Sequence, residues 1–342
     1  MGRAVRLAAL VAFGLALVAA AGSRGESAAP RPAAPRFDPS GASEVPTAVA
    51  RVGPAVVGLR ARIPPDRPSA ATLGVERWGS GILVDPDGTA VTVGYVVLEA
   101  TALEAVLRDG RTVPARVLGH DFESGLALLR LAGGGAYPAA TVGRSGPVAP
   151  GQPASIVGMT EDGRLTAVPA SVTAIRRFVA YWEYLLERAL IVAPSHPAFG
   201  GAALVDSDGA LIGVVSLRLD REHLAIPIDL LPPVRDAVVT RGRPDRPPRS
   251  WLGVRAVAVE GGVGIAGVSP AGPAHAAGLR HGDIVVRFNG DRVADVEDFY
   301  RKLWRVGVGG AIELTVLRDG RLETITVKTR DRHAVFQFRS PE

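Results

Sequence analysis

The stretch AFGGAALVDSDGALIGVVS, residues 198–216, consists of two apolar runs on either side of an Asp-Gly dipeptide, Asp208-Gly209. An Asp-Gly pair between apolar runs is a strong short-range signal for a β-hairpin. The same dipeptide recurs at Asp87-Gly88, Asp109-Gly110, Asp162-Gly163 and Asp319-Gly320. Many short strands at such spacing, with little helical periodicity, predict an all-β barrel or sandwich.

The same stretch resembles the nucleophile loop of HtrA-type, trypsin-like serine proteases, which follows the pattern GNSGGPLVNxxGxxIGI. On that pattern, the position of the serine nucleophile holds Gly200. The residues that fit the pattern are Gly201, Leu204, Gly209, Ile212 and Gly213. The resemblance therefore implies a loop that keeps its framework and lacks its nucleophile.

The two other catalytic positions of that family also differ in this chain. The TNxHV segment, which carries the general base, corresponds to VTVGYVV, with Tyr95 in place of histidine. The DLALLK segment, which carries the orienting aspartate, corresponds to GLALLRL, with Gly125 in place of the acid. A phenol with a pKa of about 10 is a poor base near neutrality. Acyl transfer by this route needs nucleophile, base and orienting carboxylate together, so the substitutions indicate a pseudoprotease.

Two functions from different classes follow from the resemblance. The first is a catalytically inactive HtrA-like envelope protein that binds peptides or protein C-termini and modulates protein quality control. The second is an active serine-type endopeptidase of the same family, which overall similarity alone would assign. The residues at the three triad-equivalent positions, Tyr95, Gly125 and Gly200, favour the first, and we assign no catalytic residue.

Composition excludes several classes of function. The chain has 342 residues, 47% of them hydrophobic, which is enough for two domains with their own cores. The net charge is +5, but the arginines are scattered and no stacking motif accompanies them, so we expect no nucleic-acid partner. The chain contains no cysteine, which excludes disulfides, thiol catalysis and thiolate metal sites. No two histidines have metal-ligand spacing, so we expect neither a metal nor a cofactor.

The N-terminus, MGRAVRLAALVAFGLALVAAAGS, has the features of a secretory signal. Two arginines precede an apolar core that ends in the small residues Ala19-x-Ala21. This core is shorter than the roughly 20 residues that span a bilayer. We therefore expect a cleaved signal peptide at residues 1–21 and a location in the periplasm or cell envelope. The alternative is an uncleaved N-terminal anchor, which alone would bring the chain to a membrane. Residues 22–44 are rich in Pro and Ala and predict a disordered tether.

The order of the motifs implies the domain organisation. A trypsin-like protease-fold domain of two β-barrels is expected over residues 45–240, and a Pro/Arg linker over residues 241–250. Residues 251–332 resemble the PDZ domain that follows HtrA-type protease domains, and residues 333–342 form a tail. The implied fold class is mainly β, a chymotrypsin/trypsin-like double β-barrel followed by an α+β PDZ domain. The resemblance also implies, as partners, a homotrimer or an active HtrA homologue.

The PDZ resemblance rests on WLGV, which opens at residue 251, and on GVSPAGPAHAAGLRHGDIVVRFNGDRVADVEDFYRKL, which opens at residue 267. Such domains add an extended C-terminal peptide as a further strand. The resemblance implies that the terminal carboxylate of this peptide is held by backbone N–H groups of Leu252, Gly253 and Val254. It further implies an apolar groove that selects an apolar last residue, lined by Val296, Tyr300 and Leu303, with Phe299 in the core. The alternative for each of these side chains is an ordinary core position.

Other polar residues near these motifs are expected to be structural. Ser145, in GRSGP, is expected in a surface turn between the barrels. Ser195 and His196 are adjacent in sequence, which tends to point their side chains apart, so they are expected to be loop residues. His120 and Asp121 are expected in a turn at the end of a strand.

Overall fold

The computed structural model of the chain describes residues 47–133 and 135–336. The expected signal peptide, the expected tether and residues 337–342 of the expected tail lie outside the described residues. Within the described part of the chain, no helix is long and apolar enough to cross a membrane.

Six antiparallel strands close the first β-barrel in the order β1-β2-β3-β6-β5-β4. Their bounds are Val56–Arg62 (β1), Glu76–Leu83 (β2), Thr89–Val93 (β3), Ala102–Val106 (β4), Thr112–Asp121 (β5) and Leu126–Leu131 (β6). The turn from β2 to β3 shows how the sequence specifies these hairpins. The Asp87 carboxylate accepts hydrogen bonds from the backbone N–H of Thr89 at 2.8 Å and from its hydroxyl at 2.6 Å. Gly88 supplies the positive φ of 86° that the turn requires.

Six further strands close the second barrel in the order β10-β11-β12-β9-β8-β7. Their bounds are Pro153–Met159 (β7), Leu165–Val179 (β8), Leu185–Ala193 (β9), Ala203–Val205 (β10), Leu211–Leu219 (β11) and Glu222–Pro227 (β12). Strands β8 and β9 pair from Ser171 opposite Ala193 to Val179 opposite Leu185. Residues 180–184 connect them and form the tip of the β8–β9 hairpin.

One buried apolar cluster extends across both barrels, in addition to a second cluster within the second barrel. Leu59 and Ile82 of the first barrel belong to the same buried cluster as Met159 and Val214 of the second. Each fully buried side chain of this size contributes about 1.5–3 kcal/mol relative to an exposed one. The barrels are therefore packed as a single unit, which fixes the loops between them.

Short helices flank this unit. They are α1 (Thr47–Val52), η1 (Gly53–Ala55), α2 (Ala70–Leu73), α3 (Gly94–Val97), η2 (Ile228–Leu230) and α4 (Pro232–Arg241). The end of α4 lies directly on β5, where the His120 N–H donates to the Gly242 carbonyl at 3.1 Å. A Cβ atom at Gly119 would lie 2.1 Å from that carbonyl oxygen, so only glycine permits this approach. This contact sets the point from which the chain leaves the barrels.

The C-terminal unit is a sheet of order β14-β15-β16-β18-β19, with β17 paired to β16 and with a separate pair, β13-β20. The strand bounds are Ser250–Trp251 (β13), Val254–Val259 (β14), Gly262–Val268 (β15), Ile284–Phe288 (β16), Asp291–Arg292 (β17), Ala311–Arg318 (β18), Arg321–Lys328 (β19) and Arg330–Asp331 (β20). The helices are α5 (Pro273–Ala276), α6 (Val296–Val306) and α7 (Arg332–Val335). Helix α6 begins where the Asp295 side chain accepts from the Asp298 N–H at 2.8 Å. Its Phe299 and Leu303 are fully buried in the core of this unit.

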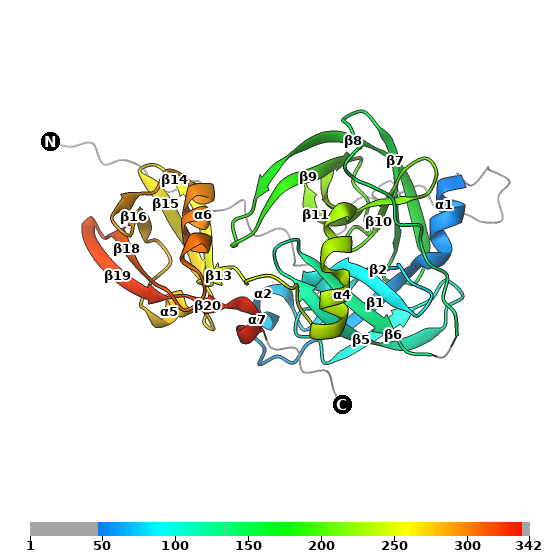
Figure 1. The fold of residues 1–342 in the computed structure, drawn as a ribbon, viewed down its shortest axis with the longest axis horizontal. Helices are drawn as coiled ribbons and strands as arrows, with labels where there is room; N and C mark the ends of the chain where they lie inside the picture. Colours follow the sequence, from blue (N-terminus) through cyan, green and yellow to red (C-terminus); the bar gives the residue numbers. More distant parts are fainter. Residues whose placement is uncertain (1–46, 134, 337–342) are drawn as a thin grey trace, which may run out of the picture.

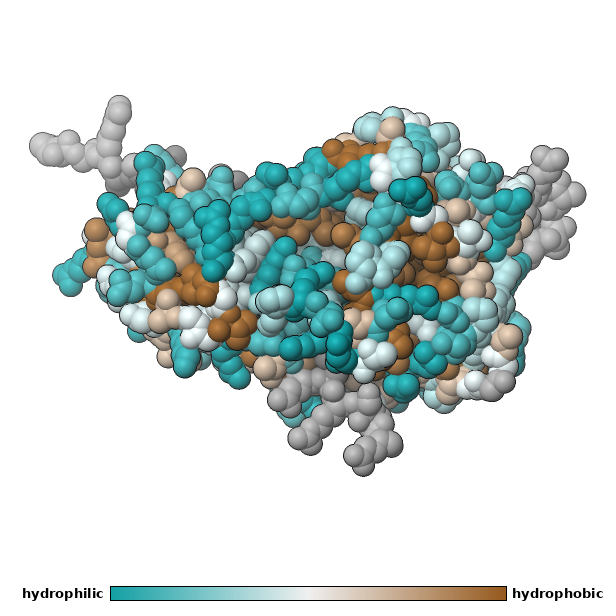
Figure 2. Space-filling model, in the orientation of Figure 1, coloured by the Kyte–Doolittle hydropathy of each residue, from teal (hydrophilic) through white to brown (hydrophobic). Residues whose placement is uncertain are grey.

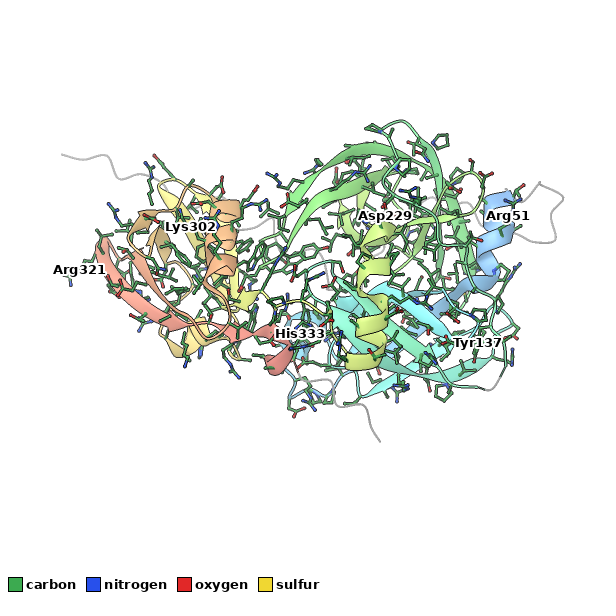
Figure 3. All side chains as sticks on the ribbon, in the orientation of Figure 1. Arg51, Tyr137, Asp229, Lys302, Arg321 and His333 are labelled. Atoms are coloured by element: carbon green, nitrogen blue, oxygen red, sulfur yellow. The ribbon has the colours of Figure 1, made fainter. Side chains whose placement is uncertain are left out.

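The C-terminal unit lies beside the barrels, and the β8–β9 hairpin extends from the second barrel toward it (Figure 1). The connecting segment is bound to the first barrel, because Arg246 pairs with Asp121 at 2.7 Å and with Glu123 at 3.1 Å. His333, in α7, lies at the junction of the two parts (Figure 3). The centroid of its ring is 4.7 Å from that of the Phe122 ring. Figure 2 shows a face on which apolar patches are separated by hydrophilic residues.

Candidate functional site

Gly200 lies in the loop between β9 and β10 and faces Tyr95 of α3. A Cβ atom at Gly200 would lie 3.0 Å from the Tyr95 hydroxyl oxygen, so the phenol fills the space into which a side chain at this position would project. Backbone hydrogen bonds fix the loop, because Ser80 N–H donates to the Gly200 carbonyl at 2.7 Å and Gly201 N–H donates to Val215 at 2.8 Å. The Thr92 hydroxyl, which lies beside Gly201, donates to the Ser80 carbonyl at 2.7 Å and is therefore also engaged in the backbone of this region.

The Tyr95 hydroxyl is committed to a structural hydrogen bond. It donates to the backbone carbonyl of Ser216 at 2.7 Å. Burial raises the pKa of the Tyr95 phenol well above its usual value, so the group is protonated throughout the physiological range. A phenol that is protonated and already donating has no tendency to take a proton from a neighbouring hydroxyl, and Tyr95 is unsuited to act as a general base.

Gly125 lies next to Gly94, the residue that precedes Tyr95. The N–H of Gly94 donates to the Gly125 carbonyl at 2.8 Å, which joins this position to the residue just before Tyr95. The backbone of Gly125 has a φ of 82°, and a Cβ atom there would lie 3.0 Å from the Tyr184 hydroxyl. That hydroxyl donates to the Ser124 carbonyl at 2.7 Å. The fold thus brings Tyr95, Gly125 and Gly200 into one region, with a tyrosine hydroxyl next to each of the two glycines.

The loop before Gly200 contains a pair of buried histidines that sequence reasoning did not connect. The backbone N–H of His196 donates to Nε2 of His223 at 2.7 Å, and the N–H of Ala198 donates to Nδ1 of His196 at 3.0 Å. Burial, followed by the nearby His223, lowers the pKa of His196 to about 4, and burial lowers that of His223 as well. Phe199 stacks on His223 at 4.9 Å. Both imidazoles are therefore neutral at pH 7 and serve as acceptors that shape the loop.

The expectation that Ser145 lies in a surface turn is wrong with respect to burial. Ser145 is 1% exposed, and its Oγ accepts from the N–H of Asp229 at 3.2 Å. The Asp229 carboxylate in turn accepts from the N–H groups of Ser145 at 3.0 Å and Gly146 at 2.7 Å. Asp229 lies in η2, just before α4 (Figure 3). The reciprocal bonds draw the turn into the molecule, which a local sequence signal does not reveal.

His120 and Asp121 end β5, and both are buried. Burial lowers the pKa of His120 to about 3, with His333 and Arg332 as the next causes, so this imidazole is neutral. The Asp121 carboxylate is paired with Arg246. Within the described residues, no group of three or more His, Asp or Glu side chains is arranged to hold a metal ion.

The backbone N–H groups of the loop before β14 converge on one carboxylate, that of Glu183. The distances to its oxygens are 2.9 Å from Leu252, 2.6 Å from Gly253 and 2.9 Å from Val254. Gly253 has a φ of 81°, and a Cβ atom there would lie 2.9 Å from Gly272, so the loop needs glycine at this point. We call the three residues Leu252–Val254 the carboxylate-binding loop. Sequence reasoning identified the loop but missed Glu183.

The chain next to Glu183 runs along β14. The N–H of Ala256 donates to the Tyr181 carbonyl at 2.6 Å. Trp182 forms an antiparallel bridge with Arg255. Residues 181–183, at the tip of the β8–β9 hairpin, therefore lie against the edge of the C-terminal sheet as a short extra strand.

The α6 side chains assigned to the groove lie against the same core as Phe299. Tyr300 and Leu303 are fully buried, and Val296 is partly buried against the cluster that contains them. The Tyr300 ring stacks on Trp304 at 5.7 Å. Burial, and after it the neighbouring Glu183 carboxylate, raises the pKa of the Tyr300 phenol. Tyr300 therefore lies close to the carboxylate that occupies the loop.

Two protein families match the chain. Residues 79–214 match the trypsin-like peptidase domain, and residues 250–329 match the PDZ domain. The structure is similar to that of the HtrA-type protease AlgW with decapeptide, with 26% identity, a TM-score of 0.52, and coverage of 84% of this chain and 98% of that one. The expected mainly-β fold class, a double barrel followed by a PDZ domain, is confirmed.

Curated relatives are similar over most of this chain. A DegP-like periplasmic serine endoprotease of Halomonas elongata is 30% identical over 74% of this chain and 56% of its own length. The Do-like HtrA serine protease of Lactobacillus helveticus is 28% identical over 73% of this chain and 68% of its own. A Do-like 14 protein of Arabidopsis thaliana is 29% identical over 75% of this chain and 66% of its own. The chain thus spans between about half and two thirds of the length of these relatives.

Proposed function

Because this chain carries an HtrA/DegP-like trypsin-like peptidase domain followed by a PDZ domain, we propose that it binds protein C-termini through the PDZ domain without cleaving them. The observation that carries this proposal is Gly200 at the nucleophile position. A Cβ atom added to Gly200 would lie 3.0 Å from the Tyr95 hydroxyl oxygen. Without a nucleophile, no acyl-enzyme can form, whatever other parts of a serine protease are present.

The groups around Gly200 support the same conclusion. Tyr95 has a raised pKa and donates to Ser216, and Gly125 offers no carboxylate. In the trypsin-like mechanism, the oxyanion is held by the N–H groups of the nucleophile and of the residue two positions before it. The second of these corresponds to Ala198, whose N–H is directed to the His196 imidazole. Other residues thus stand at the positions of the nucleophile, the base and the orienting acid. One of the two oxyanion donors is engaged in a hydrogen bond within its own loop.

The PDZ domain supports the binding part of the proposal. Its carboxylate-binding loop presents three N–H groups at 2.6–2.9 Å to a carboxylate, which is the arrangement that captures a peptide terminus. The solved structure of AlgW that is similar over 84% of this chain is one with a decapeptide. We infer that the ligands of this chain are peptides with a free C-terminal carboxylate and an apolar last residue.

The second candidate function is serine endopeptidase activity, which is favoured by the names of the relatives, several of which are serine proteases. The two candidates differ in whether an activated serine exists. The purified mature protein should not react with a fluorophosphonate, and peptides with a free carboxylate should bind while amidated ones bind weakly. Labelling that maps to Ser195 or Ser145 would establish the endopeptidase instead.

The proposed location is the periplasm or cell envelope. The N-terminal signal pattern supports it, as do the relatives named as periplasmic endoproteases. The mature protein should then begin at or near Gly22. N-terminal sequencing that finds intact Met1 in a soluble cytoplasmic protein would overturn this proposal.

A further inference from the structure

Glu183 places a buried carboxylate where a peptide terminus would bind. It belongs to the barrel unit, yet its two oxygens accept from all three N–H groups of the carboxylate-binding loop. Glu183 is buried, with only 7% of the residue exposed. A buried carboxylate is costly unless hydrogen bonds satisfy it, and the loop supplies them. Glu183 and the loop are therefore matched to each other.

The backbone of the hairpin tip also pairs with β14. Tyr181 accepts from Ala256 at 2.6 Å, and Trp182 opposes Arg255 in antiparallel register. A peptide bound to such a domain adds to the same strand in extended form, with its terminal carboxylate in the loop and its main chain along the strand edge. Residues 181–183 reproduce both parts of that arrangement from within the same chain.

From these contacts, we propose that Tyr181–Glu183 is an internal ligand that closes the PDZ groove of the resting protein, with the Glu183 side chain in place of a terminal carboxylate. This deepens the proposed function, on which it rests, by stating how the binding site is regulated. A protein C-terminus has to displace the hairpin tip, so its apparent dissociation constant equals the intrinsic one divided by the fraction of molecules in which the groove is open.

The contacts that flank the tip are compatible with release. Arg177 of β8 pairs with Glu297 of α6 at 2.9 Å, and Glu187 of β9 pairs with Arg301 of α6 at 2.6 Å. The Glu187 side chain is 58% exposed and that of Arg177 is 51% exposed. Ion pairs this exposed contribute little to stability, so the tip is held by the hydrogen bonds of Glu183 together with the backbone pairing of residues 181 and 182 to β14.

The test uses the full mature chain and the Glu183→Ala variant, with Glu187→Gln as the matched control. The control removes a carboxylate that also joins the barrels to α6, but leaves the carboxylate-binding loop filled. Two quantities are measured for each protein. The first is hydrogen exchange of the backbone amides of Leu252–Val254, and the second is binding of fluorescein-labelled decapeptides ending in Val, Leu or Phe with a free carboxylate.

We expect Glu183→Ala to speed exchange of the loop amides at least about tenfold and to tighten peptide binding at least about tenfold, since the groove no longer has an occupant. Glu187→Gln should change neither quantity by more than about twofold, because an exposed pair holds little energy. Glu183→Gln, which keeps the size of the side chain and one acceptor oxygen, should give smaller changes in the same direction. This variant serves if Glu183→Ala lowers the melting temperature below that of the assay.

The outcomes separate the two proposals. Faster exchange with no peptide bound to either protein supports the internal ligand and refutes peptide binding as the function. Equal exchange and equal peptide affinity in wild type and both Glu183 variants overturns the internal ligand while the peptide-binding function holds.

Discussion

The protonation of Glu183 offers a quantitative test in which pH is the perturbation. Burial raises the pKa of this carboxyl to about 7 from its ordinary value of 4.5, against the opposing effects of the loop N–H groups and Arg332. The docked hairpin tip therefore binds protons more readily than a released, solvated tip. By linkage, docking is strongest below the released pKa and weakens as the pH rises through the docked one.

The magnitude follows from these two values. When the pH falls from 8 to 6, Glu183 takes up most of a proton in the docked state and almost none in the released state. The equilibrium constant for docking therefore increases about tenfold, or by about 1.4 kcal/mol. The terminal carboxylate of a peptide, with a pKa of about 3.5, stays ionised at both values of pH. Because the peptide competes with the tip, its apparent affinity should be about tenfold weaker at pH 6 than at pH 8.

The assay is fluorescence anisotropy of a labelled decapeptide with a free carboxylate, titrated with protein at pH 6, 7 and 8. Glu183→Gln is the control, since it cannot titrate at this position. Any contribution of the histidines cancels in the comparison, because both proteins share them. Tyr300, which faces Glu183, is protonated at every pH used, since burial raises its pKa. Wild-type affinity that is constant or that increases as the pH falls from 8 to 6 would refute the reasoning.

Three further substitutions test the two sites. Gly200→Ser should yield neither casein hydrolysis nor fluorophosphonate labelling, because triad members act as a unit and Tyr95 is not a base. Mass-spectrometric detection of a labelled serine at position 200 would contradict this. Tyr95→Phe removes the hydrogen bond to Ser216 and should lower the free energy of unfolding in urea by about 1 kcal/mol; an unchanged midpoint would show that the bond contributes nothing. Gly253→Val places a side chain against Gly272 at a φ of 81°, so peptide binding should be lost even in combination with Glu183→Ala. Retained binding in that double variant would place the carboxylate site elsewhere.

The features that the sequence predicted are those carried by local signals. The Asp-Gly turns mark hairpins wherever the flanking runs are apolar, and their succession predicts an all-β barrel or sandwich, which the family resemblance narrows to a double barrel. The carboxylate-binding loop was predicted because WLGV and its glycine form a short motif, and Gly253 indeed has the positive φ that the loop requires. Such signals depend on a few adjacent residues, and tertiary contacts do not override them.

What sequence reasoning missed depends on contacts between distant segments. Glu183 lies 69 positions before Leu252, and nothing local marks the tip of a hairpin as a ligand for another domain. The only signal is compositional, an acid enclosed by aromatic residues in YWEY, where a solvated carboxylate is out of place. The burial of Ser145 has the same origin, since Asp229 lies 84 positions away.

The central claim, that this chain binds peptides without cleaving them, is tested most directly by proteolysis with the groove open. Fluorescein-labelled casein is incubated with the mature Glu183→Ala variant, together with a saturating C-terminal peptide, and release of fluorescent fragments is followed. The account predicts release no greater than in a blank without protein, because no nucleophile is present at Gly200. Casein cleavage that rises with protein concentration and is abolished by a fluorophosphonate would contradict it.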